Sequence, residues 1–119
     1  MEEKMKELSE KIIRLLEEKK VQELKEIIDD LYPTEFAGLT DYLPLEQTIE
    51  IFKLLKDDEK IAELLSELSS ECQANIMDAL GKEKASDILE EMDTDEAADF
   101  LGEITPEESR ELLDLMPKE

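Results

Sequence analysis

The sequence predicts an all-α protein built from short helices that stack on one another. Apolar residues recur every twelve residues over most of the chain, and inside each twelve-residue unit they have helical spacing. Glycine and proline total seven among 119 residues, too few for a sheet protein rich in tight turns. The chain is 40% apolar although its formal net charge is -21, so a folded core is expected rather than a disordered acidic chain.

Residues 1–31 predict two longer helices, at 2–18 and 21–31. Their apolar residues fall three and four places apart, which gives each helix one apolar face. This part has a net charge of -3, whereas residues 32–119 carry seven basic and 25 acidic side chains, a net charge of -18. Because the linker near Lys19 and Lys20 is too short to separate two cores, we expect residues 1–119 to form a single domain.

Residues 32–119 predict helices of about nine residues joined by corners of two or three residues. The last apolar residues of successive units are Leu31, Leu43, Leu55, Leu68, Leu80, Met92, Ile104 and Met116. Three and four places earlier lie the pairs Ile51/Phe52, Leu64/Leu65, Ile76/Met77, Ile88/Leu89, Phe100/Leu101 and Leu112/Leu113. Helices this short are marginal alone, so they must hold one another by stacking.

Helix-start signals stand at the unit boundaries. Thr105, Pro106 and Glu108 have the form of a capping box with proline at the first helical position. Asp93 followed by Glu96 has the same form, and Ser69 offers an N-cap oxygen.

Carboxylates also follow the repeat, and five of six helices carry two of them at positions i and i+4. The six pairs of positions are Glu46/Glu50, Glu59/Glu63, Glu71/Asn75, Glu83/Asp87, Asp95/Asp99 and Glu107/Glu111. The first acid gains from the helix dipole, but the second faces a like charge at a cost of ~0.2–0.5 kcal/mol. Either the surface is only solvated, or a cation neutralises it.

The available ligands restrict such a cation to hard ions. Carboxylates without histidine suit Mg²⁺, and also Mn²⁺ or Ca²⁺, although no EF-hand loop is present. Mg²⁺ keeps most of its waters and uses one or two carboxylates, so we expect weak binding.

Composition argues against several other functions. Nucleic acid is a poor partner for so acidic a chain, and no stretch is apolar enough to enter a membrane. We do not expect an enzyme, because no histidine base or glycine-rich phosphate loop accompanies the serines. Cys72 starts a helix, where a thiol pKa can fall, but a boundary role is the simpler interpretation.

The segment from Ile88 to Ile104, ILEEMDTDEAADFLGEI, resembles the signature of the cytosolic N-terminal domain of MgtE-family magnesium transporters. The family pattern L-P/D-x-E/D-x-x-A-x-x-L-x-x-L runs here from about Leu31 to Met116. The resemblance implies a right-handed superhelix in the cytoplasm, followed by CBS domains and a membrane pore in a homodimeric transporter. It also implies interfacial Mg²⁺ sites that hold the pore closed, and the family's carboxylates match Glu63, Asp95 and Asp99.

The sequence holds no CBS pattern, so the resemblance implies a fragment or a stand-alone homologue. A more distant resemblance to the helical domain of the flagellar switch protein FliG supports an alternative function. On that alternative, the chain is a helical-repeat scaffold for protein interactions with no metal role.

Overall fold

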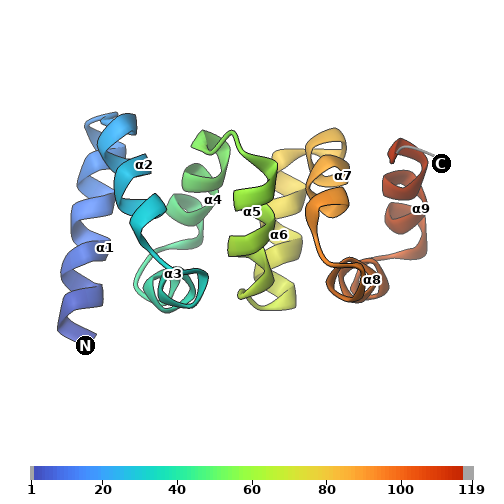
Figure 1. Ribbon diagram of the computed structural model, residues 1–119, viewed down its shortest axis with the longest axis horizontal. Helices are drawn as coiled ribbons and strands as arrows, with labels where there is room; N and C mark the ends of the chain where they lie inside the picture. The colour runs from blue at the N-terminus through green and yellow to red at the C-terminus, as the bar shows by residue number, and fades with distance from the viewer. Residues whose placement is uncertain (1, 117–119) are drawn as a thin grey trace. The chain divides into compact units, whose positions relative to one another are not determined.

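The computed structural model describes residues 2–116, which form nine α-helices and no β-strand (Figure 1). The all-α prediction is confirmed, and the helices from Pro33 onward have 8 to 11 residues, close to the nine expected. The described chain divides into two compact units, one ending at Leu55 and the other starting at Lys56. The single domain over residues 1–119 and the right-handed superhelix stay predictions.

The first unit contains α1 (Glu2–Glu17), α2 (Val21–Asp30), α3 (Pro33–Thr40) and α4 (Leu45–Leu54). Helix α1 contacts all three others, and Figure 1 shows α3 nearly end-on while α1 is seen along its length. In the core, the rings of Phe36 and Phe52 meet edge to face, with centroids 5.6 Å apart. The two longer helices expected before Leu31 are confirmed, each ending one residue earlier than predicted.

A left-handed residue makes the sharp corner between α1 and α2. Lys19 has φ of 58°, and its N–H donates to the carbonyl of Leu16 at 3.2 Å. The N–H of Lys20 donates to the carbonyl of Leu15 at 2.9 Å. These two bonds form a Schellman-type helix end, which satisfies two carbonyls that α1 leaves without helical partners.

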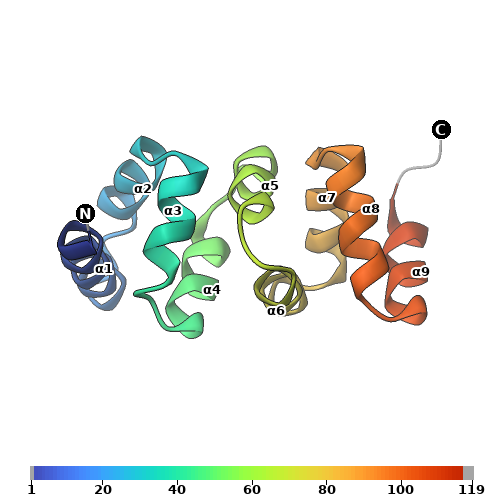
Figure 2. The same cartoon turned by 90° about the horizontal axis from the view of Figure 1, so that it is seen from below.

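The second unit contains α5 (Asp58–Ser66), α6 (Ser70–Leu80), α7 (Lys82–Glu91), α8 (Thr94–Glu103) and α9 (Pro106–Leu115). Helix α7 packs against α5, α6 and α9, whereas α8 contacts α6 and α9. Within this unit α8 runs in its own direction: it is nearly end-on in Figure 1 and seen along its length in Figure 2. Helix α7 therefore organises the unit.

The apolar pairs of the repeat form most of the core. Both members are buried in α4, α5, α6 and α7, while in α8 Phe100 is buried and Leu101 half-buried. The expectation is wrong for Leu113, which is 51% exposed although its neighbour Leu112 is buried. Consecutive residues lie about 100° apart around a helix. Leu112 therefore lies on the buried side of α9, and Leu113 on its exposed side.

Two of the three predicted caps are confirmed. The hydroxyl oxygens of Ser69 and Thr105 accept the N–H groups of Cys72 and Glu108, each at 3.2 Å. Asp93 occupies the N-cap position of α8, but its side chain makes no capping bond. The reciprocal box expected for Asp93 and Glu96 is therefore wrong, because the two carboxyl groups interact with each other and not with the backbone N–H groups.

Candidate functional site

The three carboxylates that we expect to be metal ligands lie on two helices of the second unit. Glu63 is in the last turn of α5, while Asp95 and Asp99 are one turn apart near the start of α8. All three side chains are exposed. Because residues four apart on a helix have Cβ atoms about 5–6 Å apart, Asp95 and Asp99 present two carboxylates on one face of α8.

The two helices approach one another at these ends. Ser66 and the negative charge of Glu67 both influence the pKa of Glu96, the residue next to Asp95, while the Ser66 hydroxyl donates to the carbonyl of Glu63 at 2.7 Å. Ser66 is the last residue of α5, in the same turn as Glu63, and Glu67 follows it. The start of α8 and the end of α5 therefore form one acidic surface.

This surface raises the pKa of Glu96. Burial of the carboxyl is the main cause, followed by the negative charge of Asp93 and a hydrogen bond to it, while the bond with Ser66 acts in the opposite direction. Each of these effects except the last opposes ionisation. The carboxylate of Glu96 at the start of α8 is thus repelled by the neighbouring acidic side chains of Asp93 and Glu67.

The ligands do not close around an ion within the described part of the chain. Across residues 2–116, no three Asp, Glu, Cys or His side chains gather closely enough to hold a metal. Asp95 and Asp99 supply oxygen donors of the type that Mg²⁺ prefers, and two carboxylates are the usual protein share of such a site. The arrangement fits an ion that takes its remaining ligands from water and from a second surface.

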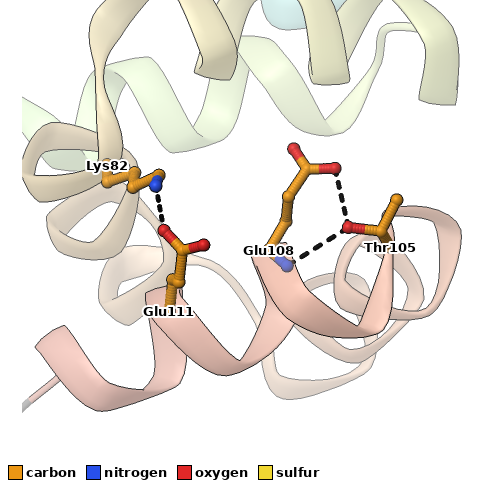
Figure 3. A network of polar contacts seen from close by, with 4 residues as sticks. All are labelled: Lys82, Thr105, Glu108 and Glu111. Carbon is orange, nitrogen blue, oxygen red and sulfur yellow. Dashed lines mark hydrogen bonds and ion pairs between the residues drawn. The ribbon is translucent and has the colours of Figure 1, made fainter.

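One of the other carboxylate pairs is neutralised by a lysine. The ammonium of Lys82, at the start of α7, forms an ion pair with Glu111 of α9 (Figure 3). Figure 3 also shows Glu108, whose carboxylate accepts the Thr105 hydroxyl at 2.9 Å. Lys84 pairs with Asp58 of α5 at 2.5 Å. The periodic acids are therefore not equivalent, because the pair of α9 has a cationic partner.

The single thiol has no feature of a nucleophile. Burial, and secondarily the charge of Glu71, raise the pKa of Cys72, which disfavours the reactive thiolate. The fall in pKa that a helix start can produce is not found.

Comparison with known proteins decides the family. The sequence profile of the family described as the MgtE intracellular N domain matches residues 31–119, three quarters of the chain. The chain belongs to this family. No curated protein matches the sequence.

A solved structure has the same fold as this MgtE N domain. It is described as the crystal structure of the soluble part of a magnesium transporter, and it matches with a TM-score of 0.83 at 19% sequence identity. The match covers 95% of this chain and 44% of the other, so the chain spans less than half of that protein. Across residues 2–116, no helix has the length and apolar character needed to cross a bilayer.

The sequence did not identify every residue of this surface. Glu96 stood out only as an expected capping residue, and neither Ser66 nor Glu67 was singled out. The repeat reports which residues share a helix face, but the approach of α5 to α8 depends on packing across the unit. No local pattern in the sequence signals that approach.

Proposed function

We propose that this MgtE N domain is a cytosolic Mg²⁺-sensing regulatory domain of a magnesium transporter, acting on the pore through Mg²⁺-dependent docking onto CBS domains. The family match over residues 31–119 carries the proposal. The exposed Asp95/Asp99 pair beside the end of α5 supports it, because oxygen ligands on an open surface suit an ion shared with a partner.

The mechanism is electrostatic. Without Mg²⁺, the acidic surface of α5 and α8 repels an acidic surface on the docking partner, and the two separate. Divalent ions between them neutralise this repulsion. On this side the ligands are Asp95, Asp99 and Glu63, with no more than two of them on one ion. Because linkage is reciprocal, Mg²⁺ strengthens docking by the factor by which docking strengthens Mg²⁺ binding.

We expect a low affinity for Mg²⁺ because this chain supplies only part of each proposed site. A site with one or two protein carboxylates binds Mg²⁺ weakly and responds at millimolar concentration. Mn²⁺ and Ca²⁺ accept the same donors, so we propose little discrimination by this chain alone. In the assembled homodimeric transporter, the CBS and membrane domains supply the other half of each site.

Thermal unfolding tests the sensing role on the chain itself. Millimolar MgCl₂ should raise the unfolding temperature more than NaCl at equal ionic strength, because an ion bound only to the folded state stabilises it. In Asp95→Asn/Asp99→Asn this extra effect should disappear. The matched control is Glu83→Gln/Asp87→Asn, which removes an exposed pair with the same spacing from α7 and should keep the effect.

Two results of the unfolding experiment would contradict the proposal. If MgCl₂ and NaCl act alike on the native chain, or if both double variants lose the same increment, the ions act only by screening.

The second candidate is a helical-repeat interaction scaffold without metal sensing. The lack of any three-ligand cluster within residues 2–116 favours it. On this alternative, the native chain and Asp95→Asn/Asp99→Asn bind partners equally well with and without Mg²⁺. A pull-down with the CBS region in EDTA and in MgCl₂ therefore separates the two functions.

A further inference from the structure

A groove of about 640 Å³ opens between α6, α7, α8 and α9. Its apolar lining includes Met77, Phe100 and Leu112, which are buried, and Ile104, which is half-buried. All of its lining residues belong to the second unit, and none of them is Glu63, Asp95 or Asp99. The groove is therefore a separate feature from the acidic surface of α5 and α8.

The rim of the groove is negatively charged. Asp78, Glu103 and Glu108 line it and are exposed, and Lys82 is the only basic lining residue within the described part of the chain. Lys82 is already paired with Glu111, so its charge is compensated (Figure 3). Three carboxylates thus face an occupant without a free cation among the lining residues.

The wider electrostatic field has the same sign. Residues 56–119 contain six basic and 21 acidic side chains, a net charge of -15. An acidic occupant would be repelled, and so would the same unit of a second copy. A cationic occupant would be attracted over the range of a Debye length, about 8 Å at physiological salt.

The shape of the groove favours a helix over an extended peptide among cationic partners. Residues 2–116 contain no strand, so no sheet edge offers hydrogen bonds to an extended peptide. A groove between helices with an apolar floor instead accepts the apolar face of an amphipathic helix.

We propose that this groove is a docking site for an amphipathic helix of a partner protein whose polar face carries lysine or arginine. The apolar side chains of that helix lie on Met77, Phe100 and Leu112, and its cations reach Asp78 and Glu103. Docking needs no metal ion, so it stands or falls independently of Mg²⁺ sensing.

The test uses a defined probe in EDTA. An acetylated and amidated peptide of about 14 residues, made of leucine and lysine with leucines at i, i+3, i+4 and i+7, is titrated into the chain by calorimetry and by amide NMR. The largest shifts should fall on the lining residues of α6 to α9. A peptide with the leucines replaced by serine should not bind.

Matched charge variants separate docking from general attraction. Asp78→Lys/Glu103→Lys should weaken binding about tenfold or more, whereas Glu90→Lys/Glu91→Lys changes the net charge equally, away from the groove, and should stay within about twofold. Ala74→Phe, which fills the groove from α6, should also weaken binding, with folding checked by circular dichroism.

Three outcomes overturn the proposal. They are equal weakening by the two charge variants, NMR shifts centred outside the groove, and a concentration-dependent dimer that covers the groove in sedimentation experiments. The last would identify a second copy of the chain as the occupant.

Discussion

Lys82 at the start of α7 and Glu111 of α9, 29 positions apart in sequence, form an ion pair that joins these two helices. Two residues further along α7, Lys84 forms a similar bridge to Asp58 of α5. The first turn of α7 therefore ties it to two of its three neighbours, α9 and α5. This pairing also leaves Glu111 a weaker candidate for a cation than the carboxylates of α8, which have no lysine or arginine partner among residues 2–116.

The two bridges should differ in strength. The side chains of Lys82 and Glu111 are 59% and 46% exposed, against 32% and 30% for Lys84 and Asp58. Because solvent screens exposed pairs, double-mutant cycles should give ~0–0.5 kcal/mol for the first bridge and up to ~1 kcal/mol for the second. Urea unfolding of the single and double alanine variants measures both. A larger coupling for the Lys82 bridge would contradict the prediction.

The helices could be predicted well from sequence because their signal is local. The twelve-residue recurrence located seven short helices, and Ser69 and Thr105 marked two starts with side chains that the structure uses as caps. The prediction failed where a residue's role depends on what lies beside the helix. Leu113 repeats the pattern of its counterparts, yet only Leu112 of this pair is buried.

The candidate site, like the helices, was predictable only where its signal lies within one helix. Asp95 and Asp99 share a helix face by their spacing alone, so the sequence identified them as a pair. The pairing of Glu111 with Lys82 and the closeness of Glu96 to Ser66 depend on tertiary packing. Neither follows from the spacing of residues within one helix.

Two glycines should respond to alanine in opposite directions. Gly102 lies inside α8, and a Cβ added there would meet no atom within 4 Å. Gly102→Ala should therefore stabilise the fold by ~0.5–1 kcal/mol, through helix propensity and a less flexible unfolded chain. Gly81 has φ of 95°, so Gly81→Ala should destabilise by about 1 kcal/mol or more. Urea unfolding checks both signs, and equal effects would contradict the assigned backbone conformations.

Gln73 holds the end of α5 from α6. Its side-chain amide donates to the carbonyls of Leu65 and Leu68, at 2.8 and 3.0 Å. Gln73→Ala should cost ~1–2 kcal/mol by removing both bonds. Gln73→Glu should cost ~2–3 kcal/mol at pH 7, since a carboxylate repels the same carbonyls.

Denaturant midpoints of these two variants measure the effect. Gln22→Glu is the control, because it adds the same charge at an exposed position of α2. If Gln73→Glu and Gln22→Glu shifted the midpoint equally, net charge rather than the contact to α5 would explain the loss.

Glu96 should make the stability of the fold depend on pH. Its pKa is raised from 4.5 by burial first and then by Asp93, so the folded state binds this proton more tightly than the unfolded state does. The resulting stabilisation is fully present below the unfolded pKa and is lost as the pH rises through the folded pKa.

Glu96→Gln keeps the shape of the side chain and removes its charge. It should raise the unfolding temperature by about 1–3 °C at pH 7, the effect of one like-charge interaction in a domain of this size, and by less near pH 4. Scanning calorimetry at both pH values measures the difference. The control is Glu90→Gln, at an exposed position of α7. If the two variants gained equally at pH 7, the gain would come from the reduced net charge of the whole chain and not from the surface where α8 meets α5.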